Sequence, residues 1–90
     1  MMYVYVLKSI NNYRFYVGMT ESVERRLKEH NSGKTKSTKG YRPWQLFFFE
    51  EYPNREEARQ REKYLKSGVG KEYIKREWSH GASRNLFTID

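Results

Sequence analysis

Residues 3–18 limit the fold most, because they alternate in the pattern of two strands joined by a turn. Tyr3–Ser9 places tyrosines and a leucine on one face and valines on the other, which is the period of a β-strand. Asn11-Asn12 marks a turn, and Arg14–Gly18 is predicted to form the partner strand. We therefore expect the chain to begin with a hairpin, which commits it to a fold built on a sheet.

A first helix and a polar loop are predicted to follow the hairpin. Thr20 can cap a helix that Glu21 begins with a favourable charge and that runs to about His30. Gly33 is well placed to end this helix. The segment 31–44 is then a polar loop, rich in Lys, Ser, Thr and Gly and without an acidic residue.

The rest of the chain adds a strand and two helices. Gln45–Tyr52 is predicted to be a strand, and its apolar run Leu46–Phe49 suits the central strand of a sheet covered on both sides. Asn54 with Glu57 resembles a capping box for a helix that would run to residue 67, where the glycines at 68 and 70 would end it. A short third helix would cover residues 71–78.

The predicted order is therefore strand-strand-helix-strand-helix-helix. We expect an α/β sandwich in which three strands, at least partly antiparallel, carry helices packed on the sheet. Ninety residues make one domain, which we place at residues 1–78. Residues 79–90 show no clear period and are expected to form a C-terminal tail without an assigned role.

The composition restricts the chemistry. Eight Tyr, five Phe and two Trp indicate a folded rather than a disordered chain. Without cysteine there are no disulfides and no thiolate sites, and two histidines are too few for a zinc site. Any metal bound here should be a hard, oxygen-ligated ion such as magnesium.

Charge and hydropathy point to a nucleic-acid partner. A net charge of +7 and a pI of about 9.7 suggest a polyanion partner, with nucleic acid ahead of a membrane surface. The longest apolar run, Leu46–Phe49, is far too short to span a membrane, and the N-terminus lacks the layout of a signal peptide, so we expect a cytoplasmic protein. Four cations of the polar loop are candidates for nucleic-acid contact, with a flexible soluble loop as the alternative: Lys34, Lys36, Lys39 and Arg42.

Glu62 is the residue that a purely structural interpretation explains least well. It lies between Ala58 and Leu65, which mark the inward stripe of the second helix, where a leucine would be ordinary. The alternative is that Glu62 borders this stripe and pairs with Arg61 or Lys66.

A second group of polar residues is predicted on the first helix and the hairpin. Arg26 and His30 lie one turn apart and share a face, which could also be a solvated surface. Tyr5 and Tyr16 lie on the two hairpin strands, where β-propensity alone could explain them. Taken together with Glu62, these residues supply a metal ligand, a cation for phosphate and groups that orient or deprotonate water. Phosphodiester hydrolysis needs such a set.

The same residues carry a family pattern. Tyr3-Val4-Tyr5 and Phe15-Tyr16-Val17-Gly18 resemble the two motifs that name the GIY-YIG nuclease superfamily. Glu24–His30 resembles the family's next helix, and Arg61-Glu62-Lys63 resembles the segment with its metal-binding glutamate. The match extends from Tyr3 to about Trp78, and two segments are especially similar to the small stand-alone bacterial YhbQ-like group: 41–46 and 61–68.

The resemblance implies a three-stranded antiparallel sheet flanked by helices (α+β) and cleavage of DNA with one divalent metal, Mg²⁺ or Mn²⁺. Tyr5 would be the general base or would orient water, and Tyr16 would hydrogen-bond at the reacting phosphate. Arg26 would stabilise the pentavalent phosphorus, and His30 would help to position or deprotonate a tyrosine or water.

Two further positions follow from the resemblance. Glu62 would hold the metal near the leaving oxygen, and Gly18 would let the backbone approach closely. Tyr73-Ile74-Lys75 stands where several family nucleases have an Asn. The expected function is DNA endonuclease activity, in repair or recombination. The sequence leaves the substrate open among single strands, flaps, branched junctions and damaged DNA, and it does not exclude RNA.

Two functions from other classes compete with this expectation. A non-catalytic nucleic-acid binder could use the basic loop together with exposed aromatics, Tyr41 and Trp44, but would have no use for an inward Glu62. An interaction module of a larger repair or ribosomal assembly would instead bind a protein partner.

Overall fold

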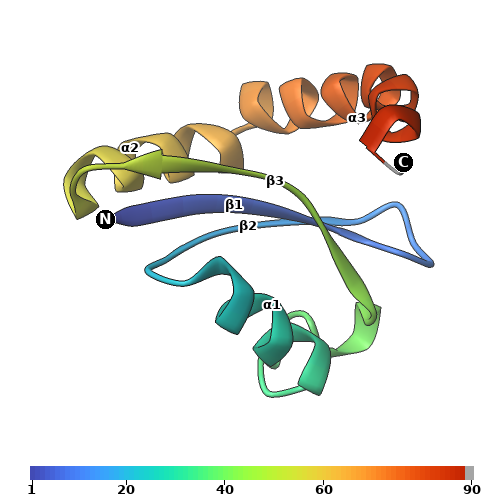
Figure 1. Ribbon diagram of the computed structural model, residues 1–90, viewed down its shortest axis with the longest axis horizontal. Coiled ribbons are helices and arrows are strands. Elements are labelled where there is room, and N and C mark those ends of the chain that lie inside the picture. Colours follow the sequence, from blue (N-terminus) through green and yellow to red (C-terminus); the bar gives the residue numbers. More distant parts are fainter. Residues whose placement is uncertain (89–90) are drawn as a thin grey trace.

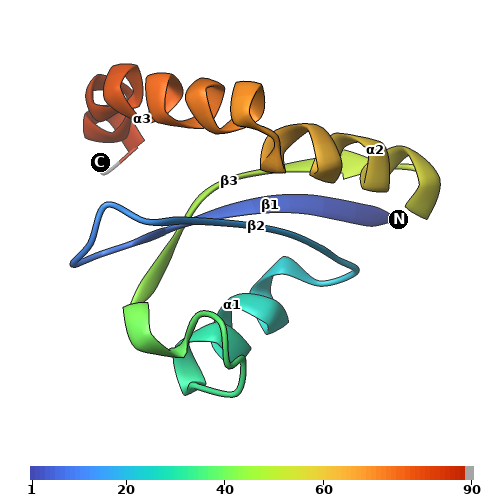
Figure 2. The same cartoon turned by 180° about the vertical axis from the view of Figure 1, so that it is seen from behind.

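A three-stranded antiparallel sheet with helices on both faces forms the protein. The computed structural model describes the backbone of residues 1–88 and the side chains of residues 1–80. The sheet has the order β2-β1-β3, and α2 and α3 lie over one face while α1 lies over the other (Figure 1). Figure 2 shows the same layers from behind. The elements are β1 (Met2–Ser9), β2 (Phe15–Thr20), α1 (Val23–Ser32), the short 3₁₀ helix η1 (Lys39–Tyr41), β3 (Trp44–Tyr52), α2 (Arg55–Lys66) and α3 (Gly68–Thr88).

This α+β fold confirms the expected order β-β-α-β-α-α and the antiparallel sheet.

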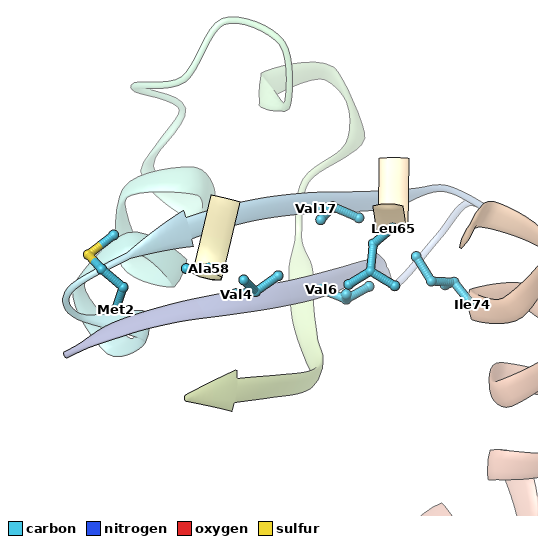
Figure 3. Packing of buried hydrophobic residues seen from close by; sticks show 7 residues of the cluster. All are labelled: Met2, Val4, Val6, Val17, Ala58, Leu65 and Ile74. Atoms are coloured by element: carbon cyan, nitrogen blue, oxygen red, sulfur yellow. The ribbon is translucent and has the colours of Figure 1, made fainter. Parts of the chain in front are cut away.

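The alternation of side chains along the strands explains the two core layers. Residues of β1 and β2 that alternate toward α2 and α3 form one core, together with residues from the two helices (Figure 3). Its buried members are Met2, Val4, Val6, Val17, Ala58, Leu65 and Ile74. The opposite face is built on Tyr5, Leu7 and Trp44, with α1 packed against it.

β3 is an edge strand, so its predicted central position was wrong, and β1 is central instead. The apolar run of β3 has another cause. Leu46 pairs with Leu7 and Phe48 pairs with Val6, which leaves Phe47 as an extra residue in a β-bulge. The bulge lets Phe47 and Phe48 pack against the same core, although they are consecutive. Phe49 is 51% exposed, as an edge strand permits.

The helix termini follow the capping signals with small shifts. α1 begins after Ser22, whose hydroxyl accepts from the Arg25 amide, and not at Glu21 with Thr20 as the cap. Gly33 ends α1 in the left-handed conformation at φ 87°, as expected. Asn54 is confirmed as the N-cap of α2, because its side chain accepts from the Glu57 amide. The second contact of the pair joins the two side chains, with Asn54 Nδ2 donating to Glu57 Oε2 at 3.2 Å.

The third helix is longer than predicted at both ends. It begins at Gly68, so the two glycines do not lie between helices, and a Cβ on Gly70 would lie 2.0 Å from the Tyr64 carbonyl oxygen. Gly70 therefore serves the close contact between α2 and α3. α3 continues past Trp78 to Thr88, so the tail expected at 79–90 extends this helix as far as residue 88. No helix in the described part of the chain is long and apolar enough to cross a membrane.

Candidate active site

Tyr5 and Gly18 form the base of the site on the α1 face of the sheet. They are paired across β1 and β2, and a Cβ at position 18 would lie 2.6 Å from the Tyr5 hydroxyl oxygen. Glycine is therefore required here because the phenol of Tyr5 lies across the neighbouring strand. The backbone at Gly18 therefore lies close against the Tyr5 phenol.

The Tyr5 hydroxyl begins a buried chain of hydrogen bonds. Its oxygen lies 2.9 Å from Nε2 of His30, and Nδ1 of His30 lies 2.8 Å from Oγ1 of Thr38. The Thr38 hydroxyl donates to the Thr35 carbonyl oxygen, at 3.3 Å. Thr38 therefore accepts from Nδ1–H of His30, which leaves Nε2 to accept from the Tyr5 hydroxyl. The network thus selects one tautomer of a neutral imidazole.

Burial sets the protonation states of both ring systems. His30 is fully buried, with 0% exposed, and desolvation lowers its pKa below the usual value, assisted by the charge of Arg26. Desolvation raises the pKa of Tyr5, and the hydrogen-bonding Arg26 guanidinium opposes this effect in part. Tyr5 is therefore a neutral phenol and His30 a neutral imidazole near pH 7. The solvated helix face considered for His30 is wrong.

Arg26 covers this pair from α1 and is itself held by an acid. Its Nη1 donates to Oε1 of Glu29 at 2.6 Å. This ion pair raises the pKa of Arg26 and lowers that of Glu29. Glu29 is a member of the site that the sequence analysis missed, although its position three residues after Arg26 was a usable signal.

Tyr16 completes the cluster from β2. Its ring centroid lies 4.7 Å from that of His30 and 6.2 Å from that of Tyr5. The predicted quartet of Tyr5, Tyr16, Arg26 and His30 is thus brought together on one face. Thr38 was missed, because a threonine in a polar loop gives no signal of a contact to a helix residue.

Glu62 lies on α2, which packs on the other side of the sheet and also contacts β2. Its side chain is 12% exposed and pairs with Lys66 Nζ at 3.2 Å and with Arg59 Nε at 3.9 Å. Its negative charge still raises the pKa of Tyr5, so the two residues are in electrostatic reach of one another. The partner Lys66 was anticipated, whereas Arg61 binds Glu50 instead, at 2.9 Å.

A hard divalent cation at Glu62 would have few protein ligands. Side chains in the described region form no group of three or more His, Cys, Asp or Glu that could hold a metal. Glu62 would then be the protein ligand, and water and phosphate oxygens would complete the shell, as magnesium commonly binds. The cation would have to displace the Lys66 ammonium, which neutralises this carboxylate here.

The basic loop is attached to the site by Thr38 and Trp44. The Trp44 indole donates to the Thr38 carbonyl oxygen at 2.9 Å, and Trp44 is buried. Trp44 is therefore a core residue, and the stacking surface expected from it is absent. Tyr41 is half-buried beneath the Arg14 guanidinium, at 4.5 Å from the ring centroid.

The four loop cations are all exposed, namely Lys34, Lys36, Lys39 and Arg42. Nε of Arg42 donates to the Lys39 carbonyl oxygen at 2.9 Å. A Cβ on Gly33 would lie 2.7 Å from Arg42 Nη1, so the guanidinium packs over the end of α1. These cations lie on the loop that carries Thr38, the residue that contacts His30.

Comparison with known proteins finds relatives that match most of this chain. The family model described as "GIY-YIG catalytic domain" matches residues 1–76. A UPF0213 protein of Clostridium perfringens is 43% identical over 67 residues, which cover 73% of this chain and 71% of that protein. The UPF0213 protein YazA of Bacillus subtilis is 42% identical, over 71% of this chain and 65% of that protein. The solution NMR structure of a UPF0213 protein from Bacillus halodurans is 38% identical, covers 82% of each chain and aligns with a TM-score of 0.49.

Proposed function

Because this chain belongs to the GIY-YIG family, in the group of small UPF0213 proteins, we propose that it is a metal-dependent endonuclease that hydrolyses DNA phosphodiester bonds. The observation that supports this most is the buried contact between the Tyr5 hydroxyl and His30 Nε2 beside Arg26. A protein that only binds nucleic acid needs exposed cations. It has no use for a phenol and an imidazole held in defined protonation states inside the domain.

Tyr5 and His30 together can activate the attacking water. A neutral phenol is a poor base, but Tyr5 can take a proton from water while its own proton passes to His30 Nε2. This transfer yields hydroxide for attack on phosphorus, a regenerated phenol and an imidazolium. Thr38 supports the step because it holds the tautomer whose Nε2 is free to accept.

Arg26 and Tyr16 would serve the phosphate. The guanidinium carries a fork of donors that matches phosphate oxygens and can stabilise the charge of the pentavalent transition state. In the free protein Arg26 is paired with Glu29, and Tyr5 is almost completely buried. Substrate binding therefore has to open this side of the site, with a phosphate replacing the Glu29 carboxylate at Arg26.

Glu62 would hold the divalent cation on the α2 side of β2. A bound Mg²⁺ or Mn²⁺ would neutralise the charge that develops on the leaving oxygen. The Glu62 side chain supports this assignment because it is only 12% exposed and offers the hard oxygen atoms that these cations prefer. The leaving oxygen takes its proton from solvent.

A cleavage assay tests the proposal. Purified protein is incubated with labelled single-stranded, duplex and branched DNA, in magnesium, manganese or EDTA. We expect metal-dependent products that vanish in Glu62→Gln and Tyr5→Phe but persist in Glu72→Gln, an exposed acid on α3. DNA that stays intact in every lane, with a gel shift still present, would show instead a binding module with the same fold.

A further inference from the structure

A cavity of about 370 Å³ lies between β2 and the junction of α2 with α3. Its floor consists of buried aliphatic side chains, Val17, Leu65 and Ile74, which lie close together in Figure 3. The volume is within the range of small-molecule sites, roughly 300–1,000 Å³. A flat apolar group bound against this floor would be shielded from solvent.

Two aromatic rings form one wall of the cavity. Tyr13 and Phe15 pack edge to face, with ring centroids 5.3 Å apart. Phe15 is fixed in turn by Trp78, at 6.0 Å. Tyr13 is 58% exposed, so its ring is both held by a neighbour and available to a ligand. Such a surface suits the π-face of a nucleobase.

Four cations surround this apolar interior: Arg14, Lys66, Lys71 and Lys75. None of the described residues that line the cavity is acidic. Lys71 and Lys75 are exposed and lie on the same face of α3, one turn apart. An anion with an attached flat apolar group therefore complements the cavity better than a neutral ligand would.

Two residues connect the cavity with the candidate active site. Tyr16 lines it and also packs on His30. Lys66 lines it and also pairs with Glu62. A nucleotide in the cavity would thus lie on the α2 side of the edge strand β2, beside Lys66 and Glu62.

We propose that this cavity binds one unpaired DNA nucleotide next to the scissile phosphate. The base lies against Tyr13 and the aliphatic floor, and the phosphates contact Lys71 and Lys75. A paired base cannot reach a floor of buried side chains, so the site favours single-stranded or frayed segments over intact duplex. This inference rests on the proposed function and deepens it by naming the substrate class.

Binding in EDTA tests the site without cleavage. Fluorescence anisotropy of labelled oligothymidylate and of a blunt duplex is measured with the full-length protein and its variants. Tyr13→Ala is expected to weaken oligothymidylate binding about 5- to 100-fold, as loss of a stacking partner does, and to leave duplex binding unchanged. Lys71→Gln with Lys75→Gln is expected to weaken it and to flatten its dependence on salt.

Matched variants outside the cavity serve as controls. Tyr64→Ala removes another partly exposed tyrosine, and Lys28→Gln with Lys63→Gln removes two exposed lysines from other surfaces. Melting curves verify that each variant is folded, and Tyr13→Leu replaces Tyr13→Ala if the latter unfolds. The proposal is overturned if the cavity variants bind oligothymidylate no worse than these controls, or if Tyr13→Ala weakens duplex binding equally.

A scan with abasic substrates separates this inference from the proposed function. A single abasic site is moved along a single-stranded substrate, and cleavage is mapped in magnesium. We expect cleavage to fail only where the missing base would be one fixed neighbour of the cut. Cleavage that is uniform along the scan would refute the nucleotide site while leaving the nuclease intact. No cleavage anywhere, with the binding differences present, would refute the nuclease alone.

Discussion

The hydroxyl of Tyr5 lies 2.9 Å from Nε2 of His30, inside the layer between the sheet and α1. The two residues are 25 positions apart, on β1 and α1. Both are buried, and burial raises the pKa of Tyr5 and lowers the pKa of His30, so the neutral form of each is favoured. This contact pairs a proton donor with an acceptor that is neutral in the same pH range.

Gly18→Ala should disrupt the position of Tyr5, because the new Cβ would lie 2.6 Å from the hydroxyl oxygen. We expect a loss of about 1–3 kcal/mol in the free energy of unfolding, typical of overpacking, and loss of cleavage. Urea denaturation and the cleavage assay measure both. Gly40→Ala is the control, because no atom lies within 4 Å of its Cβ position. Equal behaviour of the two variants would show that Tyr5 has room to move.

His30 should make the protein less stable as the pH falls. Its folded pKa is lowered from the ordinary value of about 6.5, so the unfolded chain takes up the proton first. The stability due to neutral His30 is therefore complete above about pH 6.5 and declines toward the lower folded pKa. Melting temperatures between pH 8 and 5 should fall less steeply in His30→Gln than in the wild type. His80→Gln, at an exposed position, should retain the wild-type slope.

Thr38→Val should impair catalysis through His30, since it removes the acceptor for Nδ1–H at 2.8 Å. An unsatisfied buried donor costs about 1–3 kcal/mol, and the tautomer that receives the Tyr5 proton would no longer be selected. We expect lower kcat with little change in KM and a displaced acid limb in the pH profile. Thr38→Ser keeps the hydroxyl and should restore the profile. If Val and Ser behave alike, Thr38 only fills space.

Arg26→Ala should slow cleavage by about 10²-fold or more, in line with other losses of transition-state charge stabilisation. Arg25→Ala is a close control, because Arg25 is the preceding residue, is more exposed and meets the same Glu29 at 3.7 Å. Both variants lose one charge from α1, and Arg26→Ala also loses the proposed phosphate contact, so its DNA affinity should fall further. Single-turnover rates at saturating protein isolate the chemical step. Equal rates for the two variants would remove Arg26 from the catalytic set.

Neutralising Lys34, Lys36 and Lys39 together should weaken DNA binding and lower its dependence on salt. Each lost phosphate contact reduces the slope of log affinity against log salt by about 0.9 for duplex DNA. Anisotropy titrations at several salt concentrations measure this slope. A triple variant with Arg55, Lys28 and Lys63 changed to Gln, all exposed elsewhere, should alter it less. Identical slopes would assign the loop no contact with phosphate.

The local elements could be predicted because short-range signals encode them. The hairpin follows from the alternation of Tyr3–Ser9, and Gly33 and Asn54 mark helix ends through their own backbone preferences. The residues of the candidate site were expected from the order and spacing of their motifs, and the structure brings four of them together: Tyr5, Tyr16, Arg26 and His30. The central position predicted for β3 was wrong. A bulge at Phe47 lets two consecutive apolar residues pack on one face, and the resulting apolar run resembles a strand that is buried on both faces.

The sequence by itself determined the hairpin, the helices and the residue types available for chemistry, because period and capping act over a few residues. Only the tertiary structure decided that His30 is buried, that Thr38 fixes its tautomer, and that Glu29 holds Arg26. It also placed the cations of α3 around an apolar cavity beside β2. These features depend on which distant segments pack against a given face of a strand or helix. The sequence period shows which residues share that face, but not which segments pack on it.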